Sequence, residues 1–306
     1  MENKKQDLKR ALIYVLITFG LTWVYCLTVV YPIAHGESLS GIPSILTQLV
    51  VAAAMFFPAV GVLLTRLITK EGFKDAWLRP QIKGNVRYYL LAWFGPAVLT
   101  FAGSTLYFLL VPGSFDSSCG YMRLTMEAAG MPYEAQAVPM SMLMLIQCVQ
   151  AVFLAPALNF VTCFGEEWGW RGYLLPKVSK HFATIPTLLI TGIIWGLWHA
   201  PLTIIGHNYG LGYWGFPFTG IGMMCIFCIT LGIFMSYVTL KTQSCIPAIL
   251  AHGAINGIAA IGIYFTFDGG NAFVGPAPTG IIGMIPFIIV AIPMLISLNK
   301  SKKGTV

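Results

Sequence analysis

The chain has 306 residues, of which 57% are hydrophobic and only 9% are charged. Soluble domains carry about 25% charged residues. The mean hydropathy of +0.77 therefore excludes a soluble enzyme, a disordered chain and a small secreted scaffold. We expect an all-α integral membrane protein that forms a single polytopic domain over residues 1–306. A net charge of +7 is typical of basic loops on one side of a membrane, so we expect contacts with membrane lipids and none with nucleic acid.

Eight apolar stretches are long enough to cross a bilayer, which takes about 20 residues per helix. They cover 11–33, 45–68, 88–112, 145–175, 185–205, 216–240, 244–266 and 278–298. The first follows four basic residues, as in a signal peptide, but its apolar run is too long and no cleavage site follows. The fourth contains Pro156, so we expect it to be kinked, tilted or partly outside the membrane.

Basic residues are distributed unequally between the two sets of connections. With these spans, 17 of the 18 Lys and Arg residues fall on one side, and only Arg123 falls on the other. Because cytoplasmic loops carry the excess of Lys and Arg, we expect both termini in the cytoplasm and an even number of spans. The compact chain with short loops is typical of a bacterial multi-pass protein of the cell membrane.

Two adjacent carboxylates, Glu166 and Glu167, interrupt the fourth apolar stretch. A carboxylate at the bilayer centre costs about 2.5–3.5 kcal/mol on insertion scales, so such a pair points to function. On a helix, Glu167 and Arg171 are four residues apart and can form an ion pair. Glu166 points in a neighbouring direction and keeps lone pairs available, so it is the candidate base.

Two further polar positions lie in apolar helices: His199 in the fifth stretch, and His252 with Asn256 in the seventh. The spacing of four residues places His252 and Asn256 on one helix face. With 1.5 Å of rise per residue, all three groups lie at similar depths below the expected cytoplasmic surface. We therefore expect them to meet in one cavity that opens toward the cytoplasm.

Glycine pairs with G-x-x-x-G spacing allow membrane helices to approach closely. Of four such pairs, three adjoin the polar groups and one falls in a predicted loop. They are Gly165/Gly169, Gly192/Gly196, Gly253/Gly257 and, in the loop, Gly206/Gly210. The helices that carry the polar groups are therefore expected to pack tightly against their neighbours.

These residue types suit activation of a water molecule by a carboxylate and a histidine, with a second polar pair directed at an oxyanion. A zinc site is the alternative, with Glu166, His199 and His252 as three ligands and one position left open. The chain has no H-E-x-x-H motif of soluble zinc proteases. It also has no G-x-S-x-G motif for a serine nucleophile.

At these residues the sequence resembles the CPBP family of intramembrane proteases, which includes type II CAAX prenyl endopeptidases and bacteriocin-immunity proteins. The family pattern is E-E-x-x-x-R, then F-x-x-x-H, then H-x-x-x-N, on successive parts of a helical membrane core. All three motifs occur in order within residues 145–265, with Trp195 in place of the usual Phe. The resemblance implies a catalytic core of four helices in the C-terminal half, and leaves out the first three spans and the last.

The resemblance implies an endopeptidase that hydrolyses a peptide bond of a membrane-embedded or lipid-anchored substrate. It implies that Glu166 and His199 activate water, while Glu167 and Arg171 hold the site and engage the substrate. A non-proteolytic scaffold or a bacteriocin-immunity protein is the main alternative. A transporter is less favoured, because the sequence shows no repeat symmetry of the transporter kind.

The remaining two residues of the pattern, His252 and Asn256, are implied to stabilise the oxyanion. The family has been described both as metal-dependent and as using a metal-free glutamate. Asn256 is a poor zinc ligand and a good oxyanion donor, which favours the metal-free form. Zinc nevertheless stays open as a cofactor.

Overall fold

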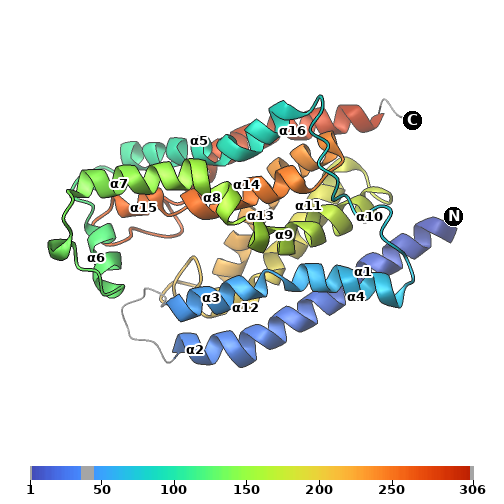
Figure 1. Cartoon of the computed structure of the whole chain (residues 1–306), viewed down its shortest axis with the longest axis horizontal. Helices are drawn as coiled ribbons and strands as arrows, with labels where there is room; N and C mark the ends of the chain where they lie inside the picture. Colours follow the sequence, from blue (N-terminus) through green and yellow to red (C-terminus); the bar gives the residue numbers. More distant parts are fainter. Residues whose placement is uncertain (1, 36–44, 304–306) are drawn as a thin grey trace.

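The computed structural model describes residues 2–35 and 45–303, and these ranges contain helices and no strand. The helices run along one long axis of the molecule (Figure 1). The protein is therefore an all-α membrane protein, as predicted. The longer helical segments are α1 (Glu2–Tyr25) continuing through a π turn (Cys26–Val30) into α2 (Tyr31–His35), α3 (Ile45–Ala54) with α4 (Phe57–Ile68), α5 (Val86–Leu110), α13 (Phe218–Thr242), α14 (Ile246–Ile258) with α15 (Ile261–Tyr264), and α16 (Ile281–Lys303).

Seven helical segments in the described part of the chain are long and apolar enough to cross a membrane. They correspond to seven of the eight predicted spans, the fourth only in its first half. The predicted fifth span, 185–205, is shorter: α11 (Thr184–Trp198) has 15 residues, and the short α12 (Ala200–Ile204) follows it. The start of α1 and the end of α16 lie at the same end of the bundle (Figure 1).

The predicted fourth span, 145–175, is not one helix but two segments separated at Asn159. The first consists of α7 (Met140–Val149), a π turn (Gln150–Leu154) and α8 (Ala155–Leu158); the second consists of α9 (Phe160–Gly169), a π turn (Trp170–Leu174) and α10 (Leu175–Ser179). Pro156 has no N–H for the carbonyl of Val152, and that carbonyl accepts the indole N–H of Trp93 at 3.1 Å instead. At the break, Asn159 Nδ2 donates to the carbonyl of Gly253 at 3.1 Å.

The G-x-x-x-G glycines lie at close helix contacts, as predicted. A Cβ added to Gly165 would lie 2.5 Å from the carbonyl oxygen of Met55, between α3 and α4. A Cβ on Gly196 would lie 2.5 Å from Cα of Cys225 on α13. The Gly206/Gly210 pair lies in a loop, where both residues have positive φ. Close backbone approach therefore brings α9, which carries the two carboxylates, and α11, which ends next to His199, against their neighbours.

A smaller set of elements closes the end of the bundle opposite to the start of α1 (Figure 1). It contains α6 (Gly120–Ala128) and a 3₁₀ turn (Tyr133–Ala135). Asp116 ties this region together, because its carboxylate accepts hydrogen bonds from the backbone N–H groups of Ser118 and Gly120.

Candidate active site

The two adjacent carboxylates leave neighbouring positions of α9 and are both buried. Glu166 is 3% exposed and Glu167 is fully buried. The π turn that begins at Trp170 follows directly, and such turns are frequent at functional sites. The two side chains meet different partners, so the sequence E-E produces two distinct environments.

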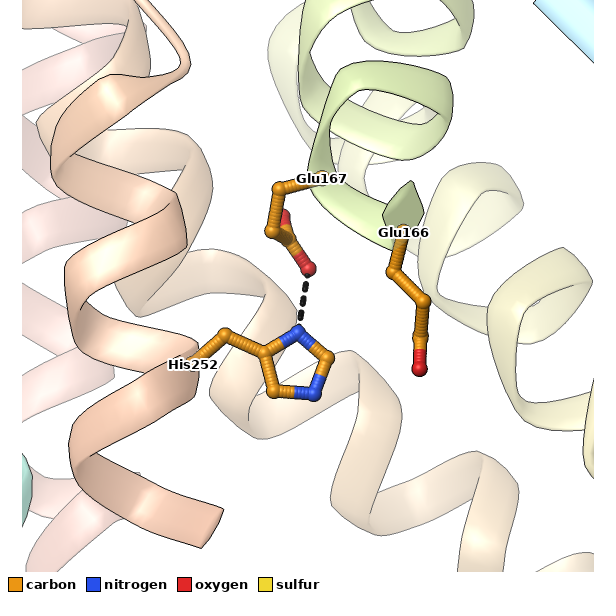
Figure 2. Close-up of side chains that lie close together, drawn as sticks. All are labelled: Glu166, Glu167 and His252. Atoms are coloured by element: carbon orange, nitrogen blue, oxygen red, sulfur yellow. Dashed lines mark hydrogen bonds and ion pairs between the residues drawn. The ribbon is translucent and has the colours of Figure 1, made fainter. Parts of the chain in front are cut away.

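Glu167 lies between two basic groups. Its Oε1 accepts a hydrogen bond from Nη1 of Arg171 at 2.9 Å, the predicted ion pair within the helix. The same oxygen lies 2.8 Å from Nδ1 of His252 on α14. A carboxylate can only accept, so His252 Nδ1 donates and its Nε2 is turned away from Glu167, on the side of Glu166 (Figure 2). This fixes the orientation of the imidazole.

Glu166 is held by two tryptophans. Its Oε2 accepts the indole N–H of Trp195 on α11 at 2.9 Å and that of Trp170 at 3.3 Å. Both indoles are almost completely buried. Within the described residues, Glu166 Oε1 accepts no hydrogen bond, so one oxygen is fixed and the other is left for a reactant.

Besides Glu166, Trp195 contacts Arg171 and both histidines of the cluster. The guanidinium carbon of Arg171 lies 4.1 Å from the centre of the indole ring, a cation–π distance. The rings of His252 and His199 lie 5.5 and 5.8 Å from it. This tryptophan therefore joins His199 to the carboxylate pair, which brings the three predicted polar groups into one cluster.

His199 lies at the break between α11 and α12, where Pro201 disfavours a continuous helix. Its backbone N–H donates to Gly196 rather than to Trp195, which leaves the Trp195 carbonyl without its usual helical donor. The imidazole Nδ1 occupies that place at 2.9 Å. Since a carbonyl only accepts, Nδ1 carries a proton and the Nε2 of neutral His199 offers a lone pair.

Asn256 lies one turn beyond His252 on α14, as predicted, but it is exposed, unlike the rest of the cluster. Its Nδ2 lies 3.7 Å from Sγ of Cys163, a weak contact. The carboxamide is therefore free to reorient toward a substrate. The predicted oxyanion role of Asn256 stays a prediction.

A metal ion would find three ligands in this cluster. One donor atom each from Glu166, Glu167 and His252 lies within 4.8 Å of the other two (Figure 2). Glu167 Oε2 is buried and has no hydrogen-bond partner in the described chain. These residues fit a divalent metal in kind and in spacing. His199 does not join this close group, so Glu167 takes the place that the sequence-based ligand set gave to His199.

Two contributions to the site were not predicted from the sequence. We expected Trp195 to form an aromatic wall, and its N–H donation to Glu166 was missed. A signal for it existed, because among the aromatic residues that replace Phe only tryptophan brings an indole N–H. The second contribution comes from α1, where Thr22 accepts the indole N–H of Trp198 at 2.7 Å and Tyr14 packs on Trp170.

The part of the chain that contains this site is similar to known proteins. Residues 148–258 match the family described as type II CAAX prenyl endopeptidase Rce1-like. The resemblance to the CPBP proteases is confirmed. The chain is also 30% identical over 93 residues to the CAAX prenyl protease 2 of Methanococcus maripaludis, a match that covers 30% of this chain and 34% of that relative. The chain thus spans about a third of the length of the curated relative it matches. The residues that match the family, 148–258, include the whole cluster from Glu166 to Asn256.

Proposed function

We propose that this protein is an intramembrane endopeptidase that cleaves a membrane-embedded or lipid-anchored peptide, with Glu166 as the base that activates water. The observation that carries the proposal is that two adjacent buried carboxylates have different hydrogen-bond and ion-pair partners. Glu166 is held on one oxygen by two indole N–H groups, while Glu167 is neutralised by Arg171 and His252. Glu167 Oε2 is also without a hydrogen-bond partner in the described chain, but Glu167 is fully buried and paired with a cation. Glu166 forms no ion pair within the same residues and is therefore the more suitable proton acceptor.

In the proposed first step, Glu166 Oε1 accepts a proton from a water molecule as the water oxygen attacks the peptide carbonyl. Because Trp195 and Trp170 fix Oε2, the carboxylate needs little rearrangement to do this. The Nε2 lone pair of neutral His199 is the second acceptor for that water. The proton on Glu166 then passes to the leaving amine as the C–N bond breaks.

The oxyanion formed in this step needs hydrogen-bond donors. When protonated, His252 donates from Nε2, and Glu167 stabilises that charge from the other side of the ring. Asn256 supplies a carboxamide N–H from the exposed face of α14. If zinc is bound by Glu166, Glu167 and His252, it would supply Lewis-acid activation of the water.

Both termini are proposed to face the cytoplasm, since nearly all basic residues then lie on the cytoplasmic side. The many exposed Leu, Ile and Phe side chains on the long helices are expected to contact lipid. A peptide anchored in the same membrane would approach the buried cluster from the surrounding lipid without leaving the bilayer. The substrate class follows from that geometry.

The experiment is a survey of new protein N-termini in host membranes, comparing wild type with Glu166→Gln at matched expression. Glutamine keeps the size of the side chain but cannot accept a proton from water, so termini made by the protein are expected to disappear. Glu127→Gln, an isosteric change at an exposed carboxylate on α6, is the control and is expected to leave them unchanged.

Identical sets of termini for wild type and Glu166→Gln would contradict the proposal. If the phenotype of a deletion is also rescued by Glu166→Gln, the protein acts as a binding partner or immunity factor instead. Metal analysis of the purified protein separates the two chemical forms. Zinc that is bound at one per chain and lost in His252→Ala would support the metal-dependent form.

A further inference from the structure

One pocket lies away from the carboxylate cluster, between three long helices. It has a volume of about 470 Å³, and residues from α5, α13 and α16 line it: Arg87, Tyr88, Leu91, Tyr237, Lys241 and Ser297. The pocket lies toward the first turn of α5 and the last turns of α13 and α16. This is the end of the bundle where α1 begins and α16 ends (Figure 1).

Two cations flank a pair of tyrosine rings in this pocket. Tyr88 and Tyr237 pack edge to face, with ring centres 5.9 Å apart. The guanidinium of Arg87 lies 4.8 Å from the centre of the Tyr88 ring and donates to its hydroxyl at 3.0 Å. Nζ of Lys241 lies 5.7 Å from the centre of the Tyr237 ring. Two positive charges are thus placed around one hollow.

No carboxylate belongs to the lining of this pocket, which distinguishes it from the other basic pocket in the described chain. This other pocket has a volume of about 210 Å³, and its lining includes Arg66, Lys177 and Asp75. There Arg66 pairs with Asp75, and Lys177 pairs with Asp7 and Glu71. The three cations in the lining of that pocket, Arg66, Lys177 and Lys180, thus each pair with a carboxylate, whereas the lining of the pocket at Arg87 and Lys241 contains two cations and no carboxylate.

Apolar side chains on the same helices extend from the pocket along the surface. Leu91 lies one turn deeper than Arg87 and forms part of the lining. Leu90 on α5 and Ile296 on α16 are 55% and 50% exposed, on helices that are apolar enough to span a membrane. The basic pocket therefore lies where an acyl chain would begin, next to a surface suited to lipid.

We propose that this pocket binds the phosphate of an anionic phospholipid headgroup. Arg87 and Lys241 supply the charge, Ser297 and the tyrosine hydroxyls supply hydrogen-bonding groups, and Leu91 with Leu90 contacts the upper part of an acyl chain. Basic pockets between membrane helices are suited to such headgroups. The bound lipid joins α5, α13 and α16, so it stabilises the bundle without touching the carboxylate cluster.

The test is native mass spectrometry of the full-length protein in detergent with added phosphatidylglycerol or phosphatidylcholine. The wild type is expected to retain phosphatidylglycerol in preference to phosphatidylcholine. In the double variant Arg87→Gln with Lys241→Gln, affinity for phosphatidylglycerol should fall about thirtyfold, from about 1 kcal/mol for each of two basic residues. The control is Arg79→Gln with Lys83→Gln, which removes the same charge from exposed positions outside the lining and should bind as the wild type does.

A folding defect in the double variant is distinguished by its melting temperature in phosphatidylcholine, which should match that of the wild type. Added phosphatidylglycerol should then raise the melting temperature of the wild type and of the control but not of the double variant. Equal retention of phosphatidylglycerol by the double variant and the wild type would overturn the proposal. So would inorganic phosphate that binds as tightly as the lipid, because the pocket would then be a site for a free anion.

Discussion

Trp195 is the residue at which this chain departs from the pattern of the family that it resembles, and in the structure its indole contacts two charged residues of the candidate site. Its indole N–H donates to Glu166 at 2.9 Å, and the guanidinium carbon of Arg171 lies over the indole ring, 4.1 Å from the ring centre. A phenylalanine would keep the face and lose the donor. Trp195 is thus a positioning residue for the proposed base, and its two contributions can be separated by one substitution.

We predict that Trp195→Phe lowers kcat about tenfold or more and leaves KM nearly unchanged, because a hydrogen bond to a charged group contributes about 1.5–3 kcal/mol. Steady-state kinetics on a substrate found in the survey of termini measures this. Trp198→Phe removes an equally buried indole donor, which bonds to Thr22 rather than to a carboxylate. A loss of kcat of the same size in Trp198→Phe would show that the effect is structural.

Among the helices, α11 packs closely against α13 because two of its residues at the contact are glycines. It packs on α13 with Gly192 and Gly196 toward that helix, where added Cβ atoms would lie 2.7 Å from Cα of Ile229 and 2.5 Å from Cα of Cys225. These neighbours are backbone atoms and cannot move aside alone. Trp195 lies between Gly192 and Gly196 in the sequence. The same close packing therefore holds its indole against Glu166 of α9.

Gly196→Ala is therefore expected to destabilise the protein by about 1–3 kcal/mol, the usual cost of overpacking, and to lower the melting temperature in detergent. Gly222→Ala on α13 is the matched control, because nothing lies within 4 Å of its added Cβ. Alanine favours a helix over glycine by up to about 1 kcal/mol, so this control should be neutral or slightly stabilising. Equal melting temperatures for the two variants would contradict the packing argument.

In the whole molecule, a buried ion network joins the N-terminal helix to the half that contains the candidate active site. Lys177 on α10 is 3% exposed and pairs with Asp7 of α1 at 3.3 Å and with Glu71 beyond α4. Tyr173 also donates to Glu71 at 2.7 Å. The first two spans, which lie outside the family resemblance, are thus bound to the helix that follows the E-E-x-x-x-R motif.

We predict that Lys177→Met destabilises the fold by about 3 kcal/mol, at the low end for breaking a buried ion pair. Asp7 and Glu71 lose the buried cation that they share and keep Lys180 and Arg10 as basic partners. Thermal unfolding in detergent measures the change. Lys180 is a second partner of Asp7, and the Lys180 side chain is half exposed. Lys180→Met should therefore lower the free energy of unfolding by less than about 1 kcal/mol. A Lys177 variant as stable as the wild type would mean that the two carboxylates are not confined by this network.

Local patterns in the sequence were sufficient for one part of this description. Composition and apolar run length determined that the protein is helical and lies in a membrane, since a bilayer requires about 20 apolar residues in each spanning helix. The Glu167–Arg171 pair followed from helical periodicity, because both residues belong to one helix. The close helix contacts at the glycine pairs followed from the absence of a side chain.

The tertiary structure alone decided which groups meet across helices. The pairing of His252 with Glu167, the hydrogen bond from Trp195 to Glu166 and the contact of Asn159 with Gly253 at the helix break each join groups that are distant in the sequence. Apolar run length does not record the rotation of one helix against another, so 145–175 was expected to be a single span. Hydropathy and spacing thus determined the class of protein and its polar residues, while helix packing assigned each carboxylate its partners.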